Sequence, residues 1–204
     1  MKAVLKGALL FALSLSSAGA MAQGWFAGGA VGVATQQDYE NGTPLVTTDD
    51  SDDSYRVFGG YQISPMQAVV ASYLSLGTAY YDGPGFGGFT DKMSAEGYDI
   101  SYVAGWAPGQ QQRFSLFGSV GVFAFTQNVR YTDSTGFFKY KDSGTTFSLG
   151  IGSEINLSAS GTNAWGLHVE YQLFKDVGSR ANSGHEHDRD VLSVGITYRF
   201  FGRD

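Results

Sequence analysis

A strict alternation of apolar with small or polar side chains near the C-terminus constrains this fold more than any other feature of the sequence. In residues 190–200 (DVLSVGITYRF), every second position from Leu192 to Phe200 is apolar, and Ser, Gly, Thr and Arg fill the positions between. Successive side chains of a β-strand point to opposite faces, so the segment predicts a strand with one wholly apolar face. Such a face must be covered by other protein or by lipid.

The same pattern recurs along the chain, which predicts an all-β fold. Eight segments carry it, at residues 24–36, 54–63, 67–77, 96–107, 113–129, 145–157, 164–174 and 190–200. Each has about the length with which a tilted strand crosses a bilayer. Short connections such as SPM and PGQQQ alternate with long polar ones such as YTDSTGFFKYKDSG. This plan predicts an eight-stranded antiparallel up-and-down transmembrane β-barrel. A soluble barrel of the lipocalin type is the alternative.

The two faces of the strands favour the membrane barrel. Gly and Ser crowd the polar side of segment 145–157, as suits the narrow interior of eight strands. Segment 113–129 is ambiguous, because Phe123 and Phe125 have the opposite parity to Val120 and Val122. Aromatic residues at the strand ends are typical of interfacial girdles. They are Trp25, Tyr61, Trp106, Trp165, Tyr198 and Phe200.

The N-terminus predicts export from the cytoplasm. Two lysines, an apolar run and small residues ending in Ala-Met-Ala indicate a secretory signal peptide over residues 1–22. We expect residues 23–204 to form the barrel domain. The apolar run is too short to span a bilayer. The chain has no cysteine, which excludes disulfides and thiolate metal sites. With 19 acidic against 13 basic residues, it is a poor candidate for binding nucleic acid.

The last hairpin, HVEYQLFKDVGSRANSGHEHDRDVLSVGITYRF (168–200), resembles that of the OmpA-type transmembrane domain family. GWFAGGAVGV (24–33) and GGYQISP (59–65) are similar to its first strand and its second strand with the following turn. The resemblance implies a monomeric barrel in the outer membrane of a Gram-negative bacterium, with both termini in the periplasm. The family's lumen holds a gate of two acidic and two basic residues. Glu154 matches one acidic position and His168 replaces an arginine, but the other two positions fall near Val70 and Val103, which cannot serve.

Parity alone predicts a charged network in the lumen. The inward positions carry three carboxylates, two guanidinium groups and a histidine. Buried charges are costly unless they are paired or hydrogen-bonded, so we expect these groups to join in one network that holds the barrel closed. They are Arg56, Asp99, Glu154, His168, Glu170 and Arg199.

Other polar residues suggest chemistry that we expect the protein not to perform. His168 has Ser148 and Glu170 within reach, a set that a lipid A-modifying enzyme could use, but all three face the lumen and predict a structural histidine. His185 and His187 could bind a transition metal, but we expect a solvated loop. The acidic segment 37–53 could bridge lipopolysaccharide phosphates through divalent cations, or be a solvated loop.

The sequence therefore predicts a non-enzymatic outer-membrane protein without cofactor or metal. Its expected role is structural, in envelope integrity, or adhesin-like, through long loops that contact a surface ligand. The expected partners are outer-membrane lipid and lipopolysaccharide. A narrow gated pore for small solutes and a lipid A-modifying enzyme remain the alternatives.

Overall fold

The computed structural model describes residues 24–37, 47–49, 51–64, 66–83, 89–106, 114–133, 136–157, 163–179 and 185–201. The expected signal peptide, residues 1–22, lies outside these ranges. For His185 the structure describes the backbone but not the side chain. Within them, no helix has the length and apolar character needed to cross a bilayer.

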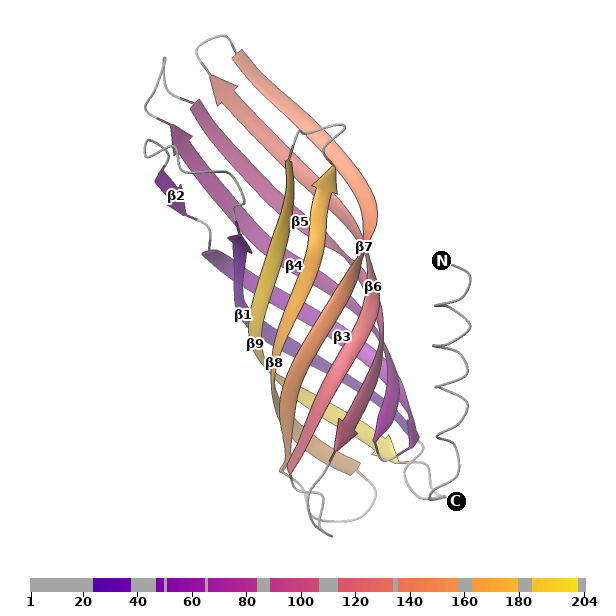
Figure 1. Cartoon of the computed structure of the whole chain (residues 1–204). Coiled ribbons are helices and arrows are strands. Elements are labelled where there is room, and N and C mark those ends of the chain that lie inside the picture. Colours follow the sequence, from indigo (N-terminus) through magenta and orange to yellow (C-terminus); the bar gives the residue numbers. More distant parts are fainter. Residues whose placement is uncertain are drawn as a thin grey trace.

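Antiparallel strands form one closed sheet (Figure 1). Its sheet order is β2-β4-β3-β1-β9-β8-β7-β6-β5, and pairing of β4 with β5 closes the ring. The short strand β2 pairs with β4 outside the ring, so eight of the described strands form the barrel wall. The predicted eight-stranded up-and-down barrel is confirmed. The strands are β1 (Gly24–Gln37), β2 (Thr47–Asp49), β3 (Ser51–Ser64), β4 (Gln67–Gly83), β5 (Phe89–Trp106), β6 (Phe114–Asp133), β7 (Gly136–Asn156), β8 (Asn163–Ser179) and β9 (His185–Phe201).

The outer surface of the barrel is apolar and the interior carries the polar residues. Ile196 is 52% exposed on the outside, whereas its neighbour Thr197 is 3% exposed in the lumen. In the ambiguous strand, now β6, Phe123 and Phe125 point inward and the valines point outward. A soluble barrel has the opposite arrangement, so the face assignment agrees with a membrane barrel.

Placing a charge on the outer face tests that assignment. We expect Ile196→Lys to lower the free energy of unfolding in lipid vesicles by about 2–4 kcal/mol, because the ammonium would lie in hydrocarbon. Thr197→Lys should cost less, because Thr197 borders a lumen cavity close to the acidic Glu154. Denaturant titrations of both variants and of Ile196→Val would measure the order. A larger loss for Thr197→Lys would reverse the assignment of faces.

Four strands continue beyond the rest of the barrel. β8 pairs with β7 only along Ser148–Asn156, whereas β7 begins at Gly136 and its hairpin with β6 is paired to the tip. β4, β5, β6 and β7 thus extend upward as a sheet, which we call the extension (Figure 1). The prediction of long loops here was wrong. Phe137 to Lys141 are exposed on both faces, so this hairpin has no period-2 contrast for sequence analysis to detect.

Two β-bulges lie where the barrel meets the extension. Gly77 has a φ of 67° at the bulge in β4, and Asp176 has a φ of 50° at the bulge in β8. Oδ2 of Asp52 accepts a hydrogen bond from the amide of Thr78 at 2.7 Å. Bulges bend strands, which allows β4 to leave the curvature of the barrel. Asp52 was expected in a solvated acidic loop, but it lies in β3 and holds this bulge.

Candidate functional site

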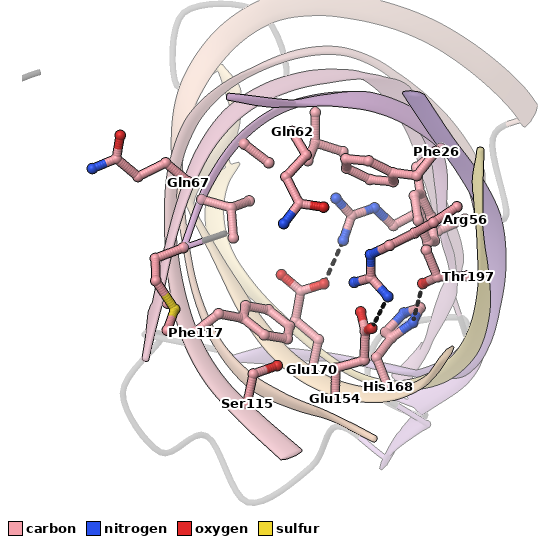
Figure 2. Close-up of a pocket in the computed structure, with 17 residues that line it drawn as sticks. Phe26, Arg56, Gln62, Gln67, Ser115, Phe117, Glu154, His168, Glu170 and Thr197 are labelled. Carbon is pink, nitrogen blue, oxygen red and sulfur yellow. Dashed lines mark hydrogen bonds and ion pairs between the residues drawn. The ribbon is translucent and has the colours of Figure 1, made fainter. Parts of the chain in front are cut away.

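Two ion pairs cross the lumen (Figure 2), beside a cavity that is also lined by Met66 and Gln67 at a short turn. Nη1 of Arg56 on β3 lies 2.5 Å from Oε2 of Glu170 on β8, and both side chains are more than nine-tenths buried. Nη1 of Arg199 on β9 lies 2.5 Å from Oε1 of Glu154 on β7, in a more open position. Each pair joins strands that are not neighbours, so it ties together walls that the backbone ladder does not connect.

Further hydrogen bonds support the Arg56–Glu170 pair. Arg56 also donates to Oε1 of Gln172 at 3.2 Å, and its guanidinium lies 5.2 Å from the ring centre of Phe58. Ser119 donates to Oε1 of Glu170 at 3.3 Å. The Arg56–Glu170 pair is therefore held in one geometry by at least one partner on each side.

Asp99 and His168 take part in neither ion pair. Asp99 is fully buried, and its Oδ1 accepts a hydrogen bond from Ser148 at 2.5 Å. Among the described residues it forms no ion pair. Nδ1 of His168 lies 3.3 Å from the hydroxyl of Thr197. Gly195 leaves room for this ring, since a Cβ there would lie 2.5 Å from Cε1 of His168. The six predicted lumen residues lie inside the barrel, where four of them form the two ion pairs and Asp99 and His168 each form a hydrogen bond.

The residues that could have formed a catalytic set share no hydrogen bond with one another. Ser148 is engaged by Asp99, His168 by Thr197, and Glu170 by Arg56. His168 is 4% exposed and its ring packs edge-on against Phe58, with the ring centres 5.3 Å apart. A nucleophile and its base must lie within hydrogen-bond reach of each other, and these do not share a bond.

A cavity of about 120 Å³ opens beside the ion pairs. Its lining combines charged residues such as Arg56, Glu154 and Glu170 with apolar and polar ones, among them Phe26, Phe117 and Gln62 (Figure 2). Val70 and Val103, near which the resemblance places the two gate positions without charges, also line the cavity. Valine offers no charge to pair with, so the lumen carboxylates Glu154 and Glu170 pair with Arg199 and Arg56.

An apolar plug closes the lumen above the ion pairs. Phe123 and Phe174 are both fully buried, with ring centres 4.8 Å apart. The cluster is contributed by β1, β4, β5, β6, β8 and β9. Sequence analysis missed it, although the parity of the β6 phenylalanines was the available signal. The plug consists of Ala34, Leu74, Leu76, Ala95, Phe123, Phe125, Phe174, Val177 and Val191.

A second polar layer covers the plug. Arg189 is 2% exposed and donates to the carbonyl oxygen of Leu76 at 3.0 Å. Lys175 forms an ion pair with Asp188. His187 was expected in a solvated loop, but it is 6% exposed in β9, so that prediction was wrong. Pairing of β8 with β9 continues past the predicted strand ends and turns this side chain inward. No group of three or more potential metal ligands occurs among the described residues.

Comparison with known proteins places this geometry among outer-membrane barrels. The family model of the OmpA-like transmembrane domain matches residues 20–204. Outer membrane protein A of Yersinia pseudotuberculosis is 24% identical over 186 residues, covering 88% of this chain and 49% of that protein. The chain thus spans about half the length of this relative.

A solved structure shares the fold. Ail, the attachment invasion locus protein of Yersinia pestis, solved in complex with the heparin analogue sucrose octasulfate, superposes with a TM-score of 0.50 at 16% sequence identity. The match covers 88% of this chain and 100% of Ail.

Proposed function

Since the chain belongs to the family of OmpA-like transmembrane domains, whose relatives lie in the outer membrane of Gram-negative bacteria, we propose that it is a closed barrel that displays a surface-interaction module. The barrel supplies the anchor and the extension of β4–β7 supplies the contact surface. The proposed role is adhesin-like and non-enzymatic. The observation that carries this proposal is that the extension stays paired and ordered well beyond the apolar band of the barrel.

The proposed orientation puts the short turns in the periplasm and the extension outside the cell. The strand ends near Gly24 and Phe201 lie together at the short-turn end, where β1 pairs with β9. Long segments of outer-membrane barrels face outward and short turns face the periplasm. Trp25 and Trp106, exposed on the outer face at this same end, suit the periplasmic interface.

The tip of the β6–β7 hairpin supports a binding role. Phe137, Phe138 and Tyr140 are 57%, 43% and 48% exposed. Phe137 lies on one face of the hairpin and Phe138 and Tyr140 on the other, and exposed aromatic rings are frequent anchors of interfaces. Ail carries a sulfated sugar in its solved complex, and we propose that the ligands of this hairpin are likewise glycans on a surface.

Binding of cells to glycan-coated surfaces tests the role. Replacing Phe137, Phe138 and Tyr140 with serine should reduce binding by roughly tenfold or more, since each exposed aromatic anchor contributes more than ~1 kcal/mol. A control with Thr126→Ala and Ser143→Ala, lower on the same strands, should bind like wild type. Faster migration of unheated samples on a gel would show that wild type and both variants are folded. Equal binding by these three folded proteins would contradict the adhesin-like role.

Single-cysteine labelling tests the orientation, because the chain has no cysteine of its own. A Phe137→Cys variant should react with a membrane-impermeant maleimide on intact cells. A Leu157→Cys variant, whose site is 63% exposed next to the opposite end of β7, should react only after the outer membrane is opened. The reverse pattern would invert the proposed topology.

A narrow gated pore is the second candidate. The cavity of about 120 Å³ beside the ion pairs favours it, since solute could enter the lumen from the short-turn end. The plug opposes it, since fully buried phenylalanine rings pack across the lumen above the cavity. Conductance measurements described below distinguish the two.

A further inference from the structure

Three cationic side chains form one row across the extension. Lys92 on β5 is the cross-strand partner of Arg130 on β6, and Arg130 is the partner of Lys139 on β7. Directly opposed residues of an antiparallel sheet point to the same face. Parity places this row on the outer face, opposite to the inward-facing Met93 and Val129. The chain is acidic overall, so a row of three cations is not a consequence of composition.

The row borders a hollow of about 440 Å³, and most of the residues that line it have the outward parity of the row. Thr78, Ser94 and Asn128 lie beside the row and are themselves in register across β4, β5 and β6. Their hydroxyl and amide groups can donate hydrogen bonds, and the three cations stand next to them. Hydrogen-bond donors with positive charges around a hollow are the features of a site for phosphate or sulfate groups.

No carboxylate whose side chain the structure describes forms an ion pair with the row. Among the described residues, none of the three cations forms an ion pair; Lys92 instead lies 4.9 Å from the ring centre of Tyr80. The outward carboxylate of Glu96 accepts a hydrogen bond from Tyr73 at 2.6 Å. Like charges directly opposite each other destabilise a sheet. A lysine on an edge strand can prevent unwanted pairing with another chain, which would explain Lys139 on β7. It does not explain Lys92 and Arg130, which lie on the inner strands β5 and β6.

The height of the row on the barrel indicates which anion it meets. On the outer face of β5, β6 and β7, Ile100, Val122 and Phe147 form an exposed apolar row. Glu96, Thr126 and Ser143 form the polar row four residues above, and the cations lie four residues above that. Four residues of a tilted strand rise about 10 Å. The cations therefore sit about one headgroup layer beyond the polar edge of the apolar band.

We propose that the row of Lys92, Arg130 and Lys139 binds phosphate groups of lipopolysaccharide in the outer leaflet surrounding the barrel. The inference rests on the orientation proposed above, which puts the extension outside the cell. A glycolipid phosphate would neutralise the opposed cations, and its sugars would fit above the lipid-facing strands. The contact would fix the rotation and tilt of the extension relative to the membrane, and so the direction in which the hairpin tip points.

Native mass spectrometry of the folded full-length barrel tests this, with diphosphoryl lipid A and fully dephosphorylated lipid A as probes. Wild type should retain the diphosphoryl form selectively. The triple variant Lys92→Gln, Arg130→Gln, Lys139→Gln should bind it about a hundredfold more weakly, at about fivefold per charge near a membrane surface. The charge-conserving variant Lys92→Arg, Arg130→Lys, Lys139→Arg should bind within a few fold of wild type. If the triple variant does not fold, the single variant Arg130→Gln should still show the fivefold loss.

Other outcomes would overturn the proposal. Unchanged retention of diphosphoryl lipid A by the triple variant would exclude the row as the site, and equal retention of the dephosphorylated form would exclude phosphate as the ligand group. Retention of phosphatidylglycerol equal to that of lipid A would indicate a general anionic surface. Loss of sucrose octasulfate binding with unchanged lipid A binding would assign the row to soluble sulfated glycans. Because the maleimide labelling reports orientation independently, a correctly oriented barrel with unchanged lipid A retention would overturn only this inference.

Discussion

Replacing Arg56 with alanine is expected to lower the free energy of unfolding by about 3–5 kcal/mol, because it leaves the Glu170 carboxylate buried without its cation. Both partners are more than nine-tenths buried, so little water can replace the guanidinium. Gln172 would also lose the hydrogen bond that Arg56 donates. Denaturant titrations of the barrel in lipid vesicles would measure the loss.

Three companion variants make this result specific to the pair. Arg199→Ala should cost less, since Arg199 and Glu154 are 19% and 10% exposed and water in the cavity can screen the remaining charge. Asp99→Asn removes a buried carboxylate that has no cationic partner among the described residues, so it should be neutral or stabilising. Adding Glu170→Gln to Arg56→Ala should recover part of the loss. An Arg56→Ala variant as stable as wild type would show that water fills this part of the lumen.

Truncating the plug is expected to have an effect of similar size. Phe123→Ala should cost about 3–5 kcal/mol, because the ring is fully buried against Phe174 and Phe125 and its removal leaves a cavity in a closed interior. Phe137→Ala provides the matched control: the same side chain, 57% exposed on the extension, should change the free energy of unfolding by less than about 0.5 kcal/mol.

The plug also predicts the electrical behaviour of the barrel. Wild type should show no steady porin-sized conductance in planar bilayers, because eight strands leave an interior that side chains fill. A double variant Phe123→Ala and Phe174→Ala should open more often than the Arg56→Ala variant, since it removes the largest apolar side chains from the closed section. Steady conductance by the wild-type protein would favour the gated pore over the closed anchor.

The sequence by itself determined that the chain forms a barrel and that its apolar side chains face outward. The period-2 pattern of segments such as 190–200 requires strands, and their apolar face is exposed in the structure, as with Ile196. This was predictable because side-chain alternation along a strand is a local property. Parity likewise placed Arg56, Glu154 and Glu170 inside, since each needs only its own strand to decide its direction.

Only the tertiary structure decided which of these groups meet and where the barrel ends. Arg56 pairs with Glu170 and not with Glu154, because sheet order and strand stagger set the height of each side chain in the lumen. Sheet order and stagger cannot be predicted from the sequence of a single strand. The plug depends on β6 and β8 bringing Phe123 against Phe174. The extension exists because β4, β5, β6 and β7 pair beyond the apolar band, and the row of Lys92, Arg130 and Lys139 exists because three of these strands share one register there. Backbone pairing between distant segments leaves no periodic trace where both faces meet water, so the sequence showed loops where the structure has a sheet.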